Sequence, residues 1–180
     1  ESEDDWIKTE QEYFDKVTSK NDLIIGSEVL THYYTADNTE VIFIFVYKTW
    51  EDILKAGEIN SDLEKKAWSD EKARTAFMDK QRKNFSNYHS DEIYSSLQGE
   101  KIFKPSSKEP MVVYIRVSEM AMTGEGKGYK EYNEKVIQKN PLIKGYYPNR
   151  HTWGADSRDL LEAFYYNSMA DLEKSSDENK

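Results

Sequence analysis

The chain has 180 residues, of which 37% are hydrophobic, 33% are charged and 13% are aromatic, a share of aromatics that is high for a disordered chain. The formal net charge of −9 disfavours nucleic acid and anionic membranes as partners, since both attract cationic surfaces. No cysteine is present, which excludes disulfides and thiolate chemistry, and no stretch is long and apolar enough to span a membrane.

The first part of the chain predicts a helix followed by two strands. Residues 5–20 place apolar side chains at helical spacing. Residues 23–34 and 41–47 are rich in the β-branched and aromatic residues that strands favour, and 36–39 forms a polar turn between them. The chain starts with polar residues and shows no signal peptide, so the compartment stays unknown, and a leader removed beforehand would leave the same start.

Capping boxes and prolines divide the middle of the chain. A capping box at Thr49–Asp52 predicts a helix to about Ala56, and a second at Ser61–Glu64 predicts a separate helix to about Phe85. Residues 88–94 predict a turn or a short helix. The prolines of the 104–110 segment predict a linker.

The last part of the chain predicts a strand, a helix, two strands and a helix. These elements are predicted at residues 111–117, about 128–139, 144–153 and 159–166, and from Ser168 onward. Pro148 lies inside one of the strands, and because proline lacks an N–H we expect it at a bulge or a sheet edge.

The segment 12–55 recurs as 131–174, at a constant offset of about 119 residues and without a gap. About 15 of the roughly 44 paired positions are identical, several times what chance gives, which indicates an internal repeat. We therefore predict a first module at 1–59, a helical insert and linker at 60–110, and a second module at 111–180. The counterpart of the strand at 111–117 would precede residue 1, so the first module is expected to lack its first strand.

Two aromatic-rich modules of this order resemble the dimeric α+β barrel superfamily, which includes antibiotic-monooxygenase-like and NIPSNAP-like proteins. The resemblance covers residues 5–58 and 111–178 and is most similar to a bacterial group of tandem modules, marked by the motifs at 151–159 and 88–94. It implies an α+β fold in which two ferredoxin-like modules pair as a barrel. It implies no particular activity, because the superfamily includes cofactor-free oxygenases, isomerases, haem enzymes and ligand-binding proteins.

Cross-strand register predicts the face that carries chemistry. If the second hairpin turns at Asp156–Ser157, His151 lies opposite Glu162 and Trp153 lies opposite Leu160. We expect this face to line the barrel interior, and the other face to meet the helices. The candidate catalytic residues are His151, Glu162 and Tyr166, and the candidate ligand-binding residues are His32, Tyr34, Phe45, Tyr47, Trp153 and Phe164.

The leading functional hypothesis is a soluble protein that binds a small apolar or aromatic molecule in an aromatic-lined cavity. The first alternative is a cofactor-independent enzyme, in which Glu162 orients His151 as an acid–base group. The second is a non-catalytic scaffold whose insert mediates assembly. We expect no cofactor and no metal, because the spacing of His32, His89 and His151 does not bring them together. We expect a monomer or a homodimer, and the shared histidine also has a purely structural interpretation.

Overall fold

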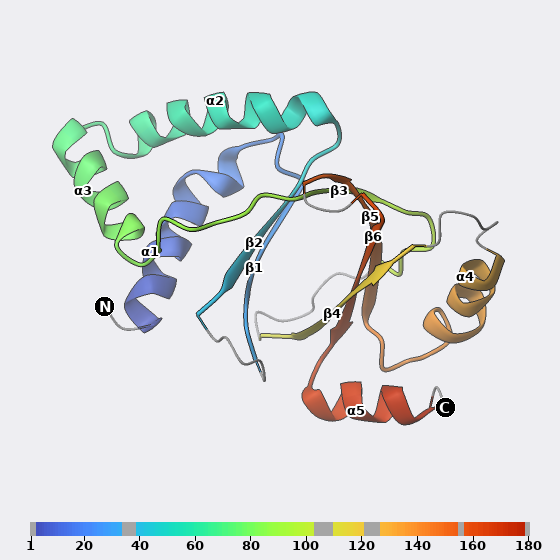
Figure 1. The fold of residues 1–180 in the computed structure, drawn as a ribbon. Helices are drawn as coiled ribbons and strands as arrows, with labels where there is room; N and C mark the ends of the chain where they lie inside the picture. Colours follow the sequence, from blue (N-terminus) through green and yellow to red (C-terminus); the bar gives the residue numbers. More distant parts are fainter. Residues whose placement is uncertain (1–2, 34–38, 103–109, 121–126, 155–156, 179–180) are drawn as a thin grey trace. The chain divides into compact units, whose positions relative to one another are not determined.

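A computed structural model describes residues 3–33, 39–102, 110–120, 127–154 and 157–178. Within these ranges the chain is an α+β protein with five α-helices and two antiparallel sheets (Figure 1). It divides into two compact units, Glu1–His89 and Ser90–Lys180. No helix in the described ranges combines the length and the apolar composition that crossing a bilayer requires.

The first unit combines a two-stranded hairpin with three helices. Strands β1, Gly26–Thr31, and β2, Val41–Val46, pair antiparallel. The other elements are α1, Glu3–Lys16, a 3-10 turn at Thr18–Lys20, α2, Trp50–Ala67, and α3, Glu71–Arg82. Because an isolated hairpin is marginally stable in water, the helices must supply much of the stability of this unit.

An aromatic stack joins the three helices of the first unit. The ring of Tyr13 on α1 stacks on Trp68, and the Trp68 and Phe77 ring centroids are 4.2 Å apart. The Tyr13 hydroxyl donates to Glu64 on α2 at 2.7 Å. Burial, and then this bond to Glu64, raise the pKa of Tyr13, so the phenol remains a neutral donor at physiological pH.

The second unit is a four-stranded antiparallel sheet with helices packed against it. The strands lie in the order β3-β5-β6-β4, with β3 at Ile93–Ser96, β4 at Val112–Glu119, β5 at Gly145–Trp153 and β6 at Asp159–Tyr166. Helix α4, Lys127–Tyr132, continues as a π-helical turn at Asn133–Ile137, and α5 spans Met169–Glu178. The buried core between sheet and helices consists of Ile137, Ile143, Tyr146, Phe164 and Tyr166.

The two copies of the repeat fold alike. In each, a helix leads into a hairpin and a second helix follows, as α1-β1-β2-α2 and as α4-β5-β6-α5. Gly26 pairs with Val46 in the first hairpin, and the equivalent Gly145 pairs with Tyr165 in the second. The strand register is therefore the same in both copies.

One buried asparagine ties each hairpin to the helix that follows it. The side-chain oxygen of Asn21 accepts from Leu23 N at 3.1 Å, and its Nδ2 donates to the Ala56 carbonyl at 3.0 Å. In the second copy, Asn140 accepts from Leu142 N at 2.9 Å and donates to Ser175 Oγ at 3.0 Å. The partners of Asn21 and Asn140 occupy equivalent positions in the two copies of the repeat. The contacts of this asparagine therefore explain part of the sequence identity between the copies.

The helices of the first unit differ from the prediction. Helix α2 runs through Ser61 without a break, so the predicted second capping box is wrong. The chain turns instead after Trp68, where the Asp70 side chain accepts from Ala73 N at 2.8 Å and starts α3. A capping motif starts a helix only where the chain before it leaves the helical conformation, and nothing before Ser61 forces that.

Residues 60–89 belong to the first unit and residues 90–110 to the second, so the predicted insert is divided between the two. The 88–94 segment, predicted as a turn or short helix, leads into β3, whose edge pairing with β5 was not visible in the local pattern. Residues 104–109 of the predicted linker lie outside the described residues.

Pro148 lies in β5, an interior strand of the sheet. Its carbonyl accepts from Leu97 N at 2.9 Å, on the side that faces β3. Because proline has no N–H to return the bond, the regular ladder with β3 ends at Ser96. The proline is therefore tolerated where the neighbouring strand stops.

Candidate functional site

Strands β5 and β6 pair three residues away from the predicted register. Glu162 lies opposite Pro148, and Leu160 lies opposite Arg150. Successive side chains alternate between the faces of a strand, so a shift by an odd number places His151 on the face opposite Glu162. The predicted pairing of His151 with Glu162 is therefore wrong. The first copy has the same shift, since Val29 rather than His32 lies opposite Phe43.

The shift also exchanges the two faces of the sheet. Phe164 and Tyr166, which were predicted to line a barrel interior, are 4% exposed and pack against the helices. Leu161, Ala163 and Tyr165 were predicted to meet the helices and instead alternate onto the other face. The aromatic side of β6 therefore fills a core beneath α4 and α5.

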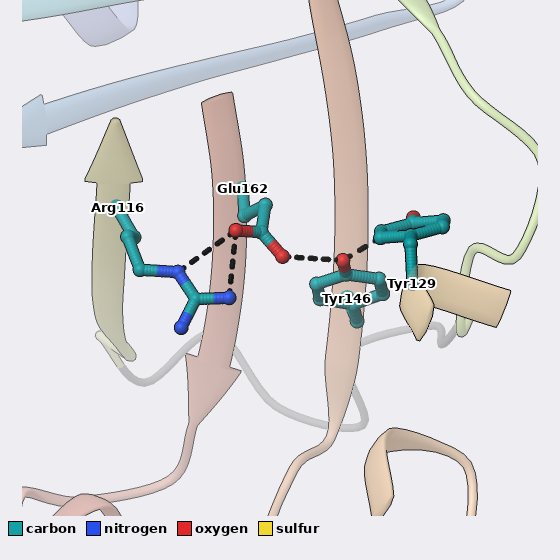
Figure 2. A network of polar contacts seen from close by, with 4 residues as sticks. All are labelled: Arg116, Tyr129, Tyr146 and Glu162. Carbon is teal, nitrogen blue, oxygen red and sulfur yellow. Dashed lines mark hydrogen bonds and ion pairs between the residues drawn. The ribbon is translucent and has the colours of Figure 1, made fainter. Parts of the chain in front are cut away.

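An ion pair between a buried carboxylate and a partly exposed guanidinium lies on this face (Figure 2). Glu162 on β6 is 2% exposed, and its Oε2 accepts from Arg116 Nε at 2.8 Å and from a terminal guanidinium nitrogen at 2.7 Å. The guanidinium also lies 5.4 Å from the centre of the Phe164 ring. Burial alone would lower the pKa of Arg116, but the bond to Glu162 outweighs burial and raises it, so the guanidinium stays charged.

Two tyrosine hydroxyls extend this network away from the ion pair (Figure 2). The Tyr146 hydroxyl donates to Glu162 Oε1 at 2.7 Å and lies 3.3 Å from the Tyr129 hydroxyl on α4. A phenol has one proton, so the chain of bonds runs from Tyr129 through Tyr146 to the carboxylate. Burial, and then the bond to Glu162, raise the pKa of Tyr146, which keeps it a donor.

His151 pairs with a carboxylate that the sequence did not single out. Its Nε2 lies 2.6 Å from Glu92 Oε2, in the segment that leads into β3. The Tyr94 ring packs edge-on against the imidazole, with centroids 5.1 Å apart. The His151 side chain is 2% exposed and that of Glu92 is 30% exposed, so the carboxylate is the accessible end of the pair.

Gly154 closes over the pair. Its φ of +134° is a conformation that L side chains rarely adopt, and an added Cβ would lie 1.7 Å from Glu92 Oε2 and 2.7 Å from His151 Nε2. Any side chain at this position would therefore displace one partner. The glycine that follows Trp153 is thus a requirement of the His151–Glu92 contact.

A hollow of about 600 Å³, open to solvent, lies at this end of β5. Its lining combines one large aromatic ring with hydroxyl, imidazole and carboxylate groups, from Asp91, His151, Thr152, Trp153, Gly154 and Ser157. The Trp153 side chain is 55% exposed. The hollow therefore offers an accessible indole beside polar groups, which is how small-molecule sites combine affinity with orientation.

Among the described residues, none of the other predicted residues is part of the lining of this hollow. In the first unit, His32 contacts Glu40 near the hairpin tip, Phe45 is 43% exposed, and Tyr47 is half-buried. Tyr34 lies outside the described residues. Of the predicted residues, His151 and Trp153 line this hollow together, whereas Phe164 and Tyr166 lie together in the core beneath the helices.

The sequence did not predict the partner of Glu162 or the partner of His151. Arg116 is the single charge within an otherwise apolar run of β4, a signal that a buried carboxylate had to be sought on a neighbouring strand. Glu92 gave no such signal, because its contact depends on the pairing of β3 with β5.

No group of three or more histidine and acidic side chains suited to a metal ion occurs in the described part of the chain. Comparisons with protein-family models, with curated proteins and with solved structures found no significant match.

Proposed function

We propose that the second unit binds a small molecule in the hollow beside His151. The observation that carries this proposal is the exposed Trp153 ring, which lines one depression together with the buried His151, itself paired with Glu92. Large, exposed aromatic rings beside fixed polar groups are typical of binding sites. The hollow replaces the predicted barrel cavity as the place where ligand binds.

The test is a fragment screen on the full chain, followed by two-dimensional NMR of the tryptophan indole N–H groups. We expect binders to shift the Trp153 signal and to leave that of Trp50, which is 47% exposed in the first unit, unchanged. Gly154→Ala should abolish binding by displacing Glu92, whereas Gly128→Ala, where an added Cβ meets nothing within 4 Å, should not. A screen in which no fragment shifts Trp153 selectively would contradict the proposal and favour a scaffold.

A second candidate is an acid–base enzyme, favoured by the different exposure of the two paired groups. Glu92 would exchange the proton, because its carboxylate is the accessible end, and His151 would position it from behind. Once a binding molecule is known, Glu92→Gln should retain binding and lose turnover if the pair is catalytic. Equal turnover in the variant would reject the enzyme and leave the binding protein.

We further propose that each unit is a ferredoxin-like module and that the two modules pair as an α+β barrel. In support, β4, α4, β5, β6 and α5 of the second unit follow the first five elements of the ferredoxin-like order, which are strand, helix, strand, strand and helix. Backbone 15N relaxation of the full chain tests the pairing. A single rotational correlation time for both units is expected, and independent tumbling would contradict it.

A further inference from the structure

The lining of the hollow is richer in hydrogen-bond acceptors than in cationic donors. Asp91 lines it and Glu92 lies behind it, whereas no lysine or arginine is among the lining residues of the described chain. The nearby Arg158 guanidinium pairs with Glu119 at 3.0 Å. The charged side chain in the lining is therefore acidic, which favours cations over carboxylates and phosphates.

The imidazole of His151 adds a further acceptor. In the neutral ring, Nε2 carries the proton because it faces the Glu92 carboxylate, so Nδ1 is left as an acceptor. This Nδ1 is buried and has no hydrogen-bond partner among the described residues. Because this nitrogen is buried, a molecule in the hollow meets instead the acceptors of the lining, the Asp91 carboxylate and the hydroxyl groups of Thr152 and Ser157, which an N–H donor can satisfy.

The indole of Trp153 supplies the apolar part of the hollow. A cation over the face of tryptophan is attracted by the ring quadrupole, and tryptophan is the best of the aromatic residues in this respect. An accessible indole next to carboxylates therefore recognises positive charge together with an apolar surface. A purely apolar ligand would leave the polar groups of the wall desolvated and unpaired.

We propose that the ligand of the hollow is a small organic cation with N–H donors, namely a protonated amine attached to an apolar group. This inference rests on the proposed binding function and names its ligand class. The ammonium group pairs with the carboxylate side of the hollow and donates hydrogen bonds, while the apolar group packs on Trp153. The sequence alone predicted only an apolar or aromatic molecule.

A matched series of probes tests the head group at constant shape: benzylammonium, benzyl alcohol and benzoate, with benzyltrimethylammonium as the cation without N–H donors. Binding to the full chain is followed by the indole N–H signals. We expect benzylammonium to bind at least about tenfold more tightly than benzyl alcohol, with benzoate the weakest. We expect the quaternary probe to bind more weakly than the primary amine, and the affinity of benzylammonium to fall with added salt.

Two pairs of variants locate the effect. Trp153→Ala should abolish the binding of benzylammonium, whereas Trp50→Ala, which removes the exposed indole of the first unit, should not. Asp91→Asn should weaken benzylammonium and leave benzyl alcohol unchanged, whereas Asp62→Asn, on exposed helix α2, should alter neither. The exposure of Trp153 makes folding insensitive to its removal.

Equal affinity for the amine and the alcohol, or preference for the quaternary cation, would overturn the inference and leave the binding function intact. If none of the probes nor any fragment shifts Trp153, both the ligand class and the proposed function fail.

Discussion

The two copies of the repeat share a backbone and differ in the groups that it carries. Both have the same hairpin register and the same buried asparagine before the hairpin. In the first copy, Phe43 packs edge-on against Phe85 on the helix side of the sheet. In the second, the equivalent position is Glu162, paired with Arg116 and Tyr146.

The histidines show the same contrast. His32 and His151 are equivalent, and each contacts a glutamate. Glu40 belongs to the first hairpin itself, whereas Glu92 approaches His151 from the segment that leads into β3, the strand that adjoins β5. The repeat therefore retains the histidine, and each copy supplies its carboxylate from a different place. Among the described residues, the two copies share the positions that set the backbone, while the buried carboxylate, Glu162, lies in the second copy.

The largest expected effect breaks the ion pair that the first copy lacks. Arg116→Met should lower the free energy of unfolding by about 3 kcal/mol, because it leaves Glu162 buried and uncompensated, and the partial exposure of Arg116 limits the loss. Urea denaturation measures it. The double variant Arg116→Met/Glu162→Phe, which installs the residue of the first copy, should recover most of the loss. If the double variant is as unstable as Arg116→Met alone, the ion pair itself stabilises the fold.

Tyr146 is replaced by Ser27 in the first copy, and Tyr146→Phe should cost about 1.5–3 kcal/mol, because the lost bond is to a charged group. The pKa of Tyr146 is raised above its unfolded value of about 10, so its contribution is complete below that pH and is lost as pH rises through the folded pKa. Urea denaturation from pH 9 to 11 should therefore show a smaller decline in Tyr146→Phe than in the parent. Tyr88→Phe, at an 89% exposed side chain, is the control and should match the parent.

The shared asparagines allow a direct comparison between the copies. Asn21→Ala and Asn140→Ala should each lower the free energy of unfolding by about 1–3 kcal/mol, because each leaves a buried backbone or hydroxyl group unpaired. Asn21→Ala should be the more severe, since Asn21 also donates to Asn60 at 2.7 Å. Thermal denaturation of the two variants measures the difference. A loss of stability in only one of the two variants would show that Asn21 and Asn140 do not play equivalent roles in the two copies.

The smallest effect concerns the helix that follows each hairpin. Thr49 Oγ1 accepts from Asp52 N at 3.3 Å, and the equivalent Ser168 Oγ accepts from Asp171 N at 3.2 Å. Replacing either by alanine should lower the free energy of unfolding by about 1 kcal/mol. Ser61→Ala, inside α2, should cause no loss, because alanine is the better helix former there. A loss at Ser61 comparable to that at Thr49 would indicate a helix start at Ser61 after all.

The candidate site was predictable only in part. His151 was identified because it recurs as His32 in the first copy, and Trp153 because it lies near His151 at the end of the same predicted strand. Their partners were not, because the hairpin turn was placed from local residues and an error of three positions reversed every face. The limits of the two strands were predicted correctly, but this did not prevent the error. A strand pattern shows that side chains alternate between two faces, but it does not show which face the helices cover.

The sequence by itself determined the repeat, the order of helices and strands within its two copies, and the caps at Thr49 and Ser168, because these depend on neighbours a few residues apart and on identity between the copies. Only the tertiary structure decided the register of β5 and β6, the pairing of Arg116 with Glu162, and the approach of Glu92 to His151. These contacts join residues about 46 and 59 positions apart. Such contacts form only when strands distant in the sequence pair, and the energy that selects one pairing is the burial of the whole face.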